Sequence, residues 1–260
     1  MQIEGSTILV TGANRGLGAA FVGALLARGA RKIYAGMRIP ASVVGHDDRV
    51  VVMKLDVTRP ESIEAAADRC RDINILISNA GVTCMHPVLA TKDETCFEET
   101  LAVNFWGPLR LSRALAPILS GKGSAAGILY ILSMASFLPA LGAEIYSSSK
   151  AAAGMMALGV REELKSSGIT VSLAYPGFIE TSMSDAFPVP KAPTSLVAER
   201  CLDGFLADET SIFPDVFADM TRECLHTRMA EILNEPSATL TRLVGAYVER
   251  MTGTNRQAAF

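Results

Sequence analysis

The stretch Thr11-Gly12-Ala13-Asn14-Arg15-Gly16-Leu17-Gly18 decides the fold class of this chain. It follows an apolar run at residues 7–10 and leads into residues 17–29, where apolar side chains recur at helical spacing. Glycines at such a turn let backbone N–H groups approach a pyrophosphate at the helix N-terminus. The spacing Gly-x-x-x-Gly-x-Gly differs from the commoner dinucleotide fingerprint, so an ordinary glycine-rich turn is the alternative. The strand before the turn and the helix after it favour a nucleotide site.

Short apolar runs and helical patterns continue to alternate along the chain. Strands are expected at residues 7–10, 32–35, 49–55, 73–78, 128–132 and 170–174, and helices at 17–29, 61–71, 94–119 and 146–165. Continuous apolar strands between amphipathic helices predict an α/β fold, a doubly wound parallel sheet with helices on both faces (Rossmann-like) in a single domain. Ligands of such a sheet bind beyond the carboxyl ends of its strands.

The pattern loosens beyond Pro188, where three prolines fall within six residues. A helix is expected at 195–206, a short last strand at 210–213, further helix at 215–250, and a frayed tail at 252–260. We expect one domain over residues 1–260, with cofactor binding and catalysis in residues 5–181. Residues 182–260 then form a substrate loop and a helical part that select the substrate.

Composition excludes several classes of function. With 260 residues, 49% apolar and 20% charged, the chain can bury one large core and is not disordered. A net charge of −3 gives no support to a nucleic-acid or anionic-membrane partner. The five cysteines are scattered without a CxxC pair, which argues for a reducing compartment and against a disulfide framework. His46, His86 and His226 have no metal-like spacing with cysteines or carboxylates, so no metal is expected.

The sequence also bears on a membrane location. The N-terminus has no basic region, which argues against a cleaved signal peptide. Residues 123–143 carry no charge and are long enough to cross a bilayer, but serines, glycines and Pro139 interrupt them. Their dense apolar run, residues 128–132, is typical of a buried strand followed by a loop. We therefore expect a cytoplasmic protein with no membrane partner.

The end of the second expected strand bears on the choice of nucleotide. A carboxylate there would bind the ribose 2′-hydroxyl of NAD, whereas an arginine accommodates the 2′-phosphate of NADP. This strand leads into Met37-Arg38 with no acid, and Arg15 lies in the glycine turn. Two guanidinium groups suit a dianionic phosphate, so we expect NADP, with NAD as the alternative. The alternative interpretation of Arg38 is a solvated loop residue.

A second group of residues points to proton transfer. Tyr146 and Lys150 are four residues apart on an expected helix and therefore share a face. A phenol with a pKa of about 10 is a poor base at neutral pH. An adjacent ammonium group favours the phenolate and draws the pKa of the phenol towards neutrality. Ser133 ends an apolar strand thirteen residues before Tyr146, where its hydroxyl can hold a substrate oxygen.

These motifs, together with Asn79-Ala80-Gly81, Asn104 and Pro176-Gly177, have the order and spacing of a known family. Over residues 5–181 the chain resembles the short-chain dehydrogenase/reductase family. The resemblance implies an oxidoreductase that transfers hydride between NAD(P) and a carbonyl or secondary alcohol. It implies that Tyr146 is the general acid/base, that Ser133 orients and polarises the oxygen, and that Lys150 lowers the pKa of Tyr146 and binds the nicotinamide ribose. It further implies that Asn104 anchors a water in a proton relay.

The cofactor contacts combine the glycine turn and Arg38 with residues carried over from the family. Asp56 and Val57 match the residues near the adenine, and Ile179 and Thr181 match those that meet the nicotinamide carboxamide. Ser78 stands where many relatives have a further asparagine, which puts one local strand-stabilising bond in doubt. The expected contacts are Gly12, Asn14, Arg15, Gly16, Leu17, Gly18, Arg38, Asp56, Val57, Asn79, Ala80, Gly81, Asn104, Tyr146, Lys150, Pro176, Gly177, Ile179 and Thr181.

The expected substrate wall is apolar, which suits a hydrophobic ketone or alcohol. Its candidate residues are Phe137, Leu138, Pro139, Leu141, Phe178, Met183, Phe187, Val189 and Leu196, with Met85 and Trp106 as additions. The alternative is that these residues pack the core under a mobile lid. Glu144 and His86 are polar candidates for substrate contact, or else solvated loop residues.

Two alternatives to the expected activity stay open. A sensor that binds a dinucleotide without catalysis has no need of Ser133, Tyr146 and Lys150 together, and an NAD-dependent enzyme of the same family is the other alternative. The missing Gly-x-Ser-x-Gly turn counts against a hydrolase. Residues 151–158 are apolar nearly all round their expected helix, which in the family commonly packs against a second subunit. We therefore expect a homodimer, with a homotetramer as the alternative.

Overall fold

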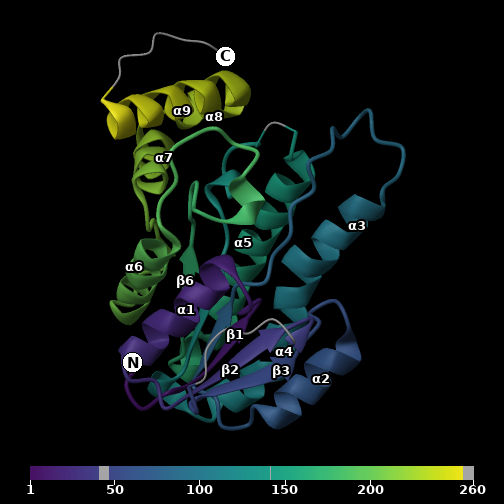
Figure 1. The fold of residues 1–260 in the computed structure, drawn as a ribbon, viewed down its shortest axis with the longest axis vertical. Coiled ribbons are helices and arrows are strands. Elements are labelled where there is room, and N and C mark those ends of the chain that lie inside the picture. Colours follow the sequence, from purple (N-terminus) through teal and green to yellow (C-terminus); the bar gives the residue numbers. More distant parts are fainter. Residues whose placement is uncertain (41–46, 141, 254–260) are drawn as a thin grey trace.

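The computed structural model describes residues 1–40, 47–140 and 142–253. Within these residues a parallel sheet of seven strands has the order β3-β2-β1-β4-β5-β6-β7 (Figure 1). The strands are β1 (Thr7–Thr11), β2 (Lys32–Met37), β3 (Val50–Lys54), β4 (Ile75–Ser78), β5 (Gly127–Ile131), β6 (Thr170–Ala174) and β7 (Ser211–Ile212). The prediction of a doubly wound parallel α/β fold is confirmed.

Helices cover both faces of this sheet. The helices of the described residues are α1 (Gly16–Ala27), α2 (Pro60–Arg69), α3 (Thr95–Leu101), α4 (Gly107–Ser120), α5 (Glu144–Leu164), α6 (Thr194–Leu206), α7 (Val216–Thr227), α8 (Met229–Asn234) and α9 (Pro236–Thr252). Short helical turns lie at η3 (Gly123–Ala125), η4 (Met134–Ser136), η5 (Lys165–Ser167) and η6 (Ser182–Ser184). In Figure 1, α1 and α6 lie on one side of the sheet, and α2, α4 and α5 lie on the other.

Alternation along β1 explains why each face is buried. Ile8 and Val10 belong to the apolar cluster under α1 and α6, which includes Phe21 and Phe205. Leu9, between them, belongs to the larger cluster under α2, α4 and α5. Successive side chains of a strand point to opposite faces, so an uninterrupted apolar run supplies both layers.

The expected helix at 94–119 is one element in the prediction and three in the structure. A π-helical segment, Ala102–Trp106, separates α3 from α4 and contains the buried Asn104. Segments of this kind insert an extra residue into a helix and recur at functional sites. A helical periodicity in the sequence cannot show such an insertion.

The expected helix at 215–250 is likewise divided, into α7, α8 and α9. Pro236 begins α9, and Glu235 before it has non-helical dihedral angles, φ −135° and ψ 58°. Proline disfavours the helical region for the residue before it, which ends α8 at this point. The expected last strand at 210–213 is confirmed by β7.

The uncharged stretch 123–143 contains β5, whose residues are all buried within the sheet. Among the helices of the described residues, none is long and apolar enough to span a membrane. Leu141, a candidate wall residue, and residues 254–260 of the expected tail lie outside the described residues.

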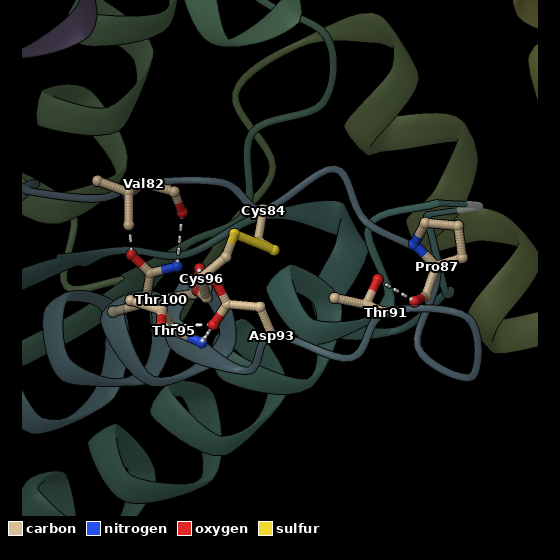
Figure 2. Close-up of a disulfide and its surroundings, with 9 residues drawn as sticks. Val82, Cys84, Pro87, Thr91, Asp93, Thr95, Cys96 and Thr100 are labelled. Carbon is tan, nitrogen blue, oxygen red and sulfur yellow. Dashed lines mark hydrogen bonds between the residues drawn. A yellow bond between two sulfur atoms is a disulfide. The ribbon is translucent and has the colours of Figure 1, made fainter.

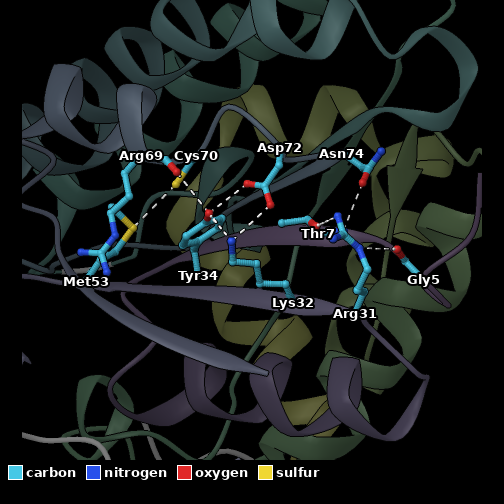
Figure 3. A network of polar contacts seen from close by, with 10 residues as sticks. All are labelled: Gly5, Thr7, Arg31, Lys32, Tyr34, Met53, Arg69, Cys70, Asp72 and Asn74. Atoms are coloured by element: carbon cyan, nitrogen blue, oxygen red, sulfur yellow. Dashed lines mark hydrogen bonds and ion pairs between the residues drawn. The ribbon is translucent and has the colours of Figure 1, made fainter. Parts of the chain in front are cut away.

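A polar network joins the amino-terminal ends of β1 and β2 to the chain before β4 (Figure 3). Lys32 Nζ donates to the Tyr34 hydroxyl at 2.6 Å, and this hydroxyl donates to Asp72 Oδ1 at 2.9 Å. The Thr7 amide donates to Asn74 Oδ1 at 3.1 Å. These bonds hold the end of the sheet that lies opposite the carboxyl ends of the strands.

Candidate active site

A cavity of about 1080 Å³ opens beyond the carboxyl ends of the strands. Every predicted cofactor or catalytic residue except Asn104 lines it. Those residues are Gly12, Asn14, Arg15, Gly16, Leu17, Gly18, Arg38, Asp56, Val57, Asn79, Ala80, Gly81, Ser133, Tyr146, Lys150, Pro176, Gly177, Ile179 and Thr181. Residues spread over 170 positions of sequence therefore meet at one site because parallel strands bring their carboxyl ends to the same edge.

The turn between β1 and α1 requires its glycines. Gly12 and Gly16 have positive φ values of +66° and +53°. A Cβ on Gly18 would lie 2.1 Å from the Gly12 carbonyl oxygen, so no side chain fits there. In the described structure no side chain caps the N-terminus of α1. The first amides of α1 are thus free to bind an anion in the cavity, as a dinucleotide phosphate requires.

The segment after β4 is fixed against this turn. The Thr11 hydroxyl accepts hydrogen bonds from the amides of Asn79 (3.0 Å) and Ala80 (2.9 Å). Asn79 Nδ2 donates to the Thr11 carbonyl at 2.9 Å. These bonds join β1 to β4 at the cavity although Ser78 replaces the further asparagine of many relatives.

The residues expected near the adenosine surround one side of the cavity. Arg15 and Arg38 are exposed and line it. Burial raises the pKa of the Asp56 carboxyl, but hydrogen bonds from the Thr58 hydroxyl and amide, and the charge of Arg38, hold the pKa below its ordinary value. The end of β2 presents Arg38 and no acid, so the arrangement fits a 2′-phosphate better than a free ribose hydroxyl.

Ser133, Tyr146 and Lys150 lie together on the other side. Ser133 directly precedes η4 and caps it, since its Oγ accepts from the Ala135 amide at 3.1 Å. Its side chain also interacts with the Tyr146 hydroxyl and lowers the pKa of that phenol. Tyr146 and Lys150 are one turn apart on α5, with Lys150 Nζ 5.8 Å from the centre of the tyrosine ring. Lys150 Nζ donates to the Ile131 carbonyl at 2.9 Å.

Burial sets the protonation of this group. It lowers the pKa of Lys150, which is 5% exposed, to about 8. It raises the pKa of Tyr146, which the hydrogen bond with Ser133 only partly offsets. Burial dominates, so the net shift of the Tyr146 pKa is upward in this structure, and the lowering of that pKa by Lys150 stays a prediction. At neutral pH the phenol keeps its proton and can donate it.

Asn104 does not line the cavity, and its side chain bonds Val82 and Ser149 instead. It is 1% exposed, and its side-chain oxygen accepts from the Val82 amide at 3.0 Å. Its Nδ2 donates to the Val82 carbonyl (2.8 Å) and to Ser149 Oγ (2.9 Å). Asn104 thus ties the segment after β4 to α5, and its part in a water relay stays a prediction.

Asp215 is a site residue that the sequence analysis missed. It is 2% exposed, and its Oδ2 accepts from the Gly177 amide at 2.7 Å. Its Oδ1 accepts from the Ala218 amide at 3.0 Å and caps α7. Burial raises the pKa of this carboxyl despite these hydrogen bonds. An aspartate directly before a helix is a common N-cap, so the sequence predicts the bond from the Ala218 amide to Asp215. It does not predict the bond from the Gly177 amide to Asp215.

The apolar part of the cavity agrees only partly with the expected wall. The expected residues that line it are Leu138, Phe178, Met183, Phe187 and Val189, and the lining residues that were not expected include Phe217 of α7 and Leu240, Thr241 and Val244 of α9. The expected residues that do not line it are Phe137, Pro139, Leu196, Met85, Trp106, Glu144 and His86.

Local contacts explain several of these differences. Phe137 packs against Tyr175, with ring centres 4.8 Å apart, and Glu144 accepts from the Gly142 amide at 3.0 Å. Leu196 and Met85 are exposed. The residues from α9 were missed because helical periodicity does not show which face of a distant helix closes over a cavity.

The expectation that the scattered cysteines form no disulfide is also wrong. The structure joins Cys84 and Cys96 in a disulfide, where scattered spacing argued against disulfides (Figure 2). His86 lies with them, and the ligand atoms of the three residues are within 4.8 Å of one another. The spacing in the sequence did not show this grouping, which arises because the loop between Cys84 and Cys96 closes back on itself.

A parallel sheet whose edge carries both a glycine turn for phosphate and a Ser–Tyr–Lys group belongs to the dinucleotide-dependent oxidoreductases. More narrowly, the chain belongs to the short-chain dehydrogenase family, because residues 6–190 match the family model described as short chain dehydrogenase. The resemblance seen in the sequence is thereby confirmed.

Individual relatives agree with this family. The chain is 33% identical to the 3-oxoacyl-[acyl-carrier-protein] reductase FabG of Escherichia coli (strain K12), over 72% of this chain and 78% of the relative. It is 28% identical to the 1-deoxy-11-beta-hydroxypentalenate dehydrogenase of Streptomyces avermitilis, over 90% and 91% of the two chains. The structure of a short chain dehydrogenase from Burkholderia cenocepacia J2315 in complex with NADP superposes with a TM-score of 0.86 at 35% identity, covering 94% of this chain and 99% of that one.

Proposed function

We propose that this chain is an NADP(H)-dependent oxidoreductase that interconverts a hydrophobic ketone and the corresponding secondary alcohol. The observation that carries the proposal is the Ser133–Tyr146–Lys150 group, which lines the same cavity as the glycine turn. We further propose that residues 5–181 bind the cofactor and perform catalysis, and that residues 182–260 select the substrate.

The fit of NADP(H) depends on groups at two places in the cavity. The amides at the N-terminus of α1 suit the pyrophosphate, and Arg15 and Arg38 suit the 2′-phosphate. The Burkholderia cenocepacia dehydrogenase, at 35% identity, was solved in complex with NADP. When bound, the nicotinamide supplies or accepts the hydride, and the protein supplies position and proton transfer.

The catalytic side chains divide the remaining work. In the reductive direction the Tyr146 phenol, protonated at neutral pH, donates its proton to the developing alkoxide. The Ser133 hydroxyl, which interacts with Tyr146, donates a hydrogen bond to the same oxygen. Lys150 places a positive charge under the tyrosine ring and, by the family resemblance, holds the nicotinamide ribose. In the oxidative direction Tyr146 accepts the alcohol proton.

A hydrophobic substrate is supported by the aromatic wall from the C-terminal part. Phe178 lies between Phe187 and Phe217, with ring centres 5.6 Å and 4.9 Å away. Leu240 and Val244 of α9 line the same cavity. Burial of apolar substrate surface against these side chains provides binding energy of about 25 cal/mol per Å².

The proposed reaction is tested by NADPH consumption with aliphatic, aromatic and polycyclic ketones. Tyr146→Phe removes the proton donor, so we expect turnover to fall by roughly 100-fold or more while NADPH still binds. Tyr34→Phe, in the polar network opposite the cavity, is the matched control and should keep its turnover. Turnover by Tyr146→Phe close to that of the wild type would show that another group donates the proton. NADPH binding without turnover of any ketone in the wild type would favour the sensor.

The cofactor preference is tested by Arg38→Ala. The variant loses one charge-assisted contact to the 2′-phosphate, a loss of about 1.5–3 kcal/mol, which corresponds to NADPH affinity weaker by about 10- to 100-fold. NADH affinity should not change, because NADH lacks that phosphate. Arg71→Ala, an exposed arginine on the chain between α2 and β4, is the control. Equal NADPH affinity in wild type and Arg38→Ala would remove Arg38 from the phosphate site.

The expected assembly has support from exposed apolar side chains near α5. Met155 and Leu158 on α5 are 72% and 38% exposed, and Trp106 beside α4 is 46% exposed. A second copy of the chain packed on these side chains would remove them from water, so we propose a homodimer, with a homotetramer as the alternative. Light scattering of the purified protein distinguishes these states from a monomer.

A further inference from the structure

Two cysteines and a histidine form a cluster that the proposed reaction does not use. Cys84 lies two residues before His86, and Cys96 lies in the first turn of α3 (Figure 2). The Cα atoms of Cys84 and Cys96 are 5.9 Å apart, and the sulfur atoms and an imidazole nitrogen of His86 lie within 4.8 Å of one another. Among the described residues, this is the one group of three His, Cys or acidic side chains whose ligand atoms lie this close together.

We propose that Cys84, His86 and Cys96 form a Zn²⁺ site that becomes available when the Cys84–Cys96 disulfide is reduced. Two thiolates and one imidazole are ligands that Zn²⁺ prefers, and water fills the fourth position of its tetrahedron. None of the three residues lines the cavity, so the site takes no direct part in the proposed oxidoreductase reaction.

The exchange between the two states is chemically balanced. A dithiol reductant transfers two electrons and two protons to the disulfide, which yields two cysteine thiols and the oxidised reductant. Zn²⁺ then displaces the two thiol protons and binds the two sulfur atoms as thiolates. Because a sulfur atom in a disulfide is not a thiolate, disulfide and Zn²⁺ site exclude each other.

The surrounding contacts hold the ligands in place for a metal ion. Asp93 Oδ1 accepts from the Thr95 amide (3.0 Å) and hydroxyl (2.6 Å), which fixes the chain just before Cys96. On the other side, Val82 is held by both side-chain ends of Asn104 (Figure 2). Both anchors persist when the disulfide opens, so the two sulfur atoms need only separate to about 3.8 Å, as two tetrahedral zinc–sulfur bonds of about 2.3 Å require.

Burial differs between the ligands in a way that suits metal exchange. Cys84 is 1% exposed, whereas His86 is exposed to solvent. A metal ion therefore enters the cluster at the exposed His86, and Cys84 is the buried ligand. Val82 and Thr83, directly before Cys84, line the cavity, so a bound ion also fixes one edge of the cavity wall.

The test uses the full chain, reduced with a phosphine and titrated anaerobically with Co²⁺ as a spectroscopic probe of the zinc site. We expect a thiolate-to-cobalt charge-transfer band that saturates at one Co²⁺ per chain and disappears when Zn²⁺ is added. The same protein oxidised to the disulfide should give no band. A reduced wild type without the band would overturn the proposal.

Variants assign the ligands. Cys84→Ser and Cys96→Ser should each lose the band, and His86→Ala should weaken Co²⁺ affinity at least about tenfold, since even loss of a supporting contact costs that much. Cys224→Ser, a buried free cysteine outside the cluster, is the matched control and should bind Co²⁺ as the wild type does. Unchanged affinity in His86→Ala, or a band in either cluster serine variant, would contradict the site.

A second measurement on the wild type covers the case in which a variant does not fold. Zn²⁺ should slow alkylation of Cys84 and Cys96 in the reduced protein, as read by mass spectrometry of the peptides. Cys70 and Cys201 are buried thiols away from the cluster, and their alkylation should not depend on Zn²⁺. Equal alkylation of Cys84 and Cys96 with and without Zn²⁺ would overturn the proposal.

Discussion

Replacing Asp215 by Asn tests whether one buried carboxylate holds the segment Pro176-Gly177 to α7. The asparagine oxygen can still accept from the Ala218 amide and cap α7, but its NH₂ group then faces the Gly177 N–H, which loses its acceptor. A hydrogen bond to a charged group contributes about 1.5–3 kcal/mol. Burial of the carboxylate, which raises its pKa, offsets part of that gain. We therefore expect Asp215→Asn to lower the free energy of unfolding by about 1–2 kcal/mol.

Urea unfolding followed by circular dichroism measures this change, and a thermal scan should show a Tm lower by about 2–8 °C. Asp215→Ala also removes the helix cap, which costs about 1 kcal/mol more. The KM for NADPH should rise in both variants, because Pro176 and Gly177 line the cavity. Asp68→Asn, an exposed aspartate of α2 paired with Arg71, is the control. An Asp215→Asn variant with wild-type stability and wild-type KM would show that other contacts hold the loop.

Two further predictions concern the glycine turn and Lys150. Gly18→Ala should abolish NADPH binding, because its Cβ would lie 2.1 Å from the Gly12 carbonyl, whereas Gly23→Ala, with no atom within 4 Å of the added Cβ, should bind normally in the same fluorescence titration. A Gly18→Ala variant that binds NADPH normally would refute the required close approach. Lys150, with its pKa lowered to about 8, should lose its charge above that pH, so kcat/KM for ketone reduction should fall with an apparent pKa near 8. Because the unfolded chain binds this proton up to its ordinary pKa of 10.5, the Lys150 contribution to stability should rise between pH 8 and 10.5. A flat rate profile through pH 8 would show that the ammonium charge is not required.

Local patterns were sufficient to predict most of the fold. The apolar runs at residues 7–10 and 128–132 are long and uninterrupted, so strands buried on both faces were the consistent interpretation. The glycine turn was equally predictable, because its function requires backbone geometry that only glycine permits at Gly12 and Gly16. For the same reason Lys150 could be placed beside Tyr146, since helical spacing alone determines that neighbourhood.

Other features depend on contacts between distant segments. Asn104, in the π-helical segment, bonds Val82 and Ser149, which lie 22 and 45 residues away in the sequence. Asp215 meets Gly177 across 38 residues, and α9 closes the cavity with Leu240 and Val244. No periodicity in the sequence predicts which distant groups will meet.

The sequence by itself determined the alternation of strands and helices, the glycine turn, and the shared helix face of Tyr146 and Lys150, because each depends on neighbours within a few residues. Only the tertiary structure decided that Asp215 accepts a hydrogen bond from the Gly177 amide and that Cys84, His86 and Cys96 lie close together. It also decided that burial lowers the pKa of Lys150 and raises that of Tyr146. Desolvation and loop closure depend on every segment packed around a group, so they exist only once the chain has folded.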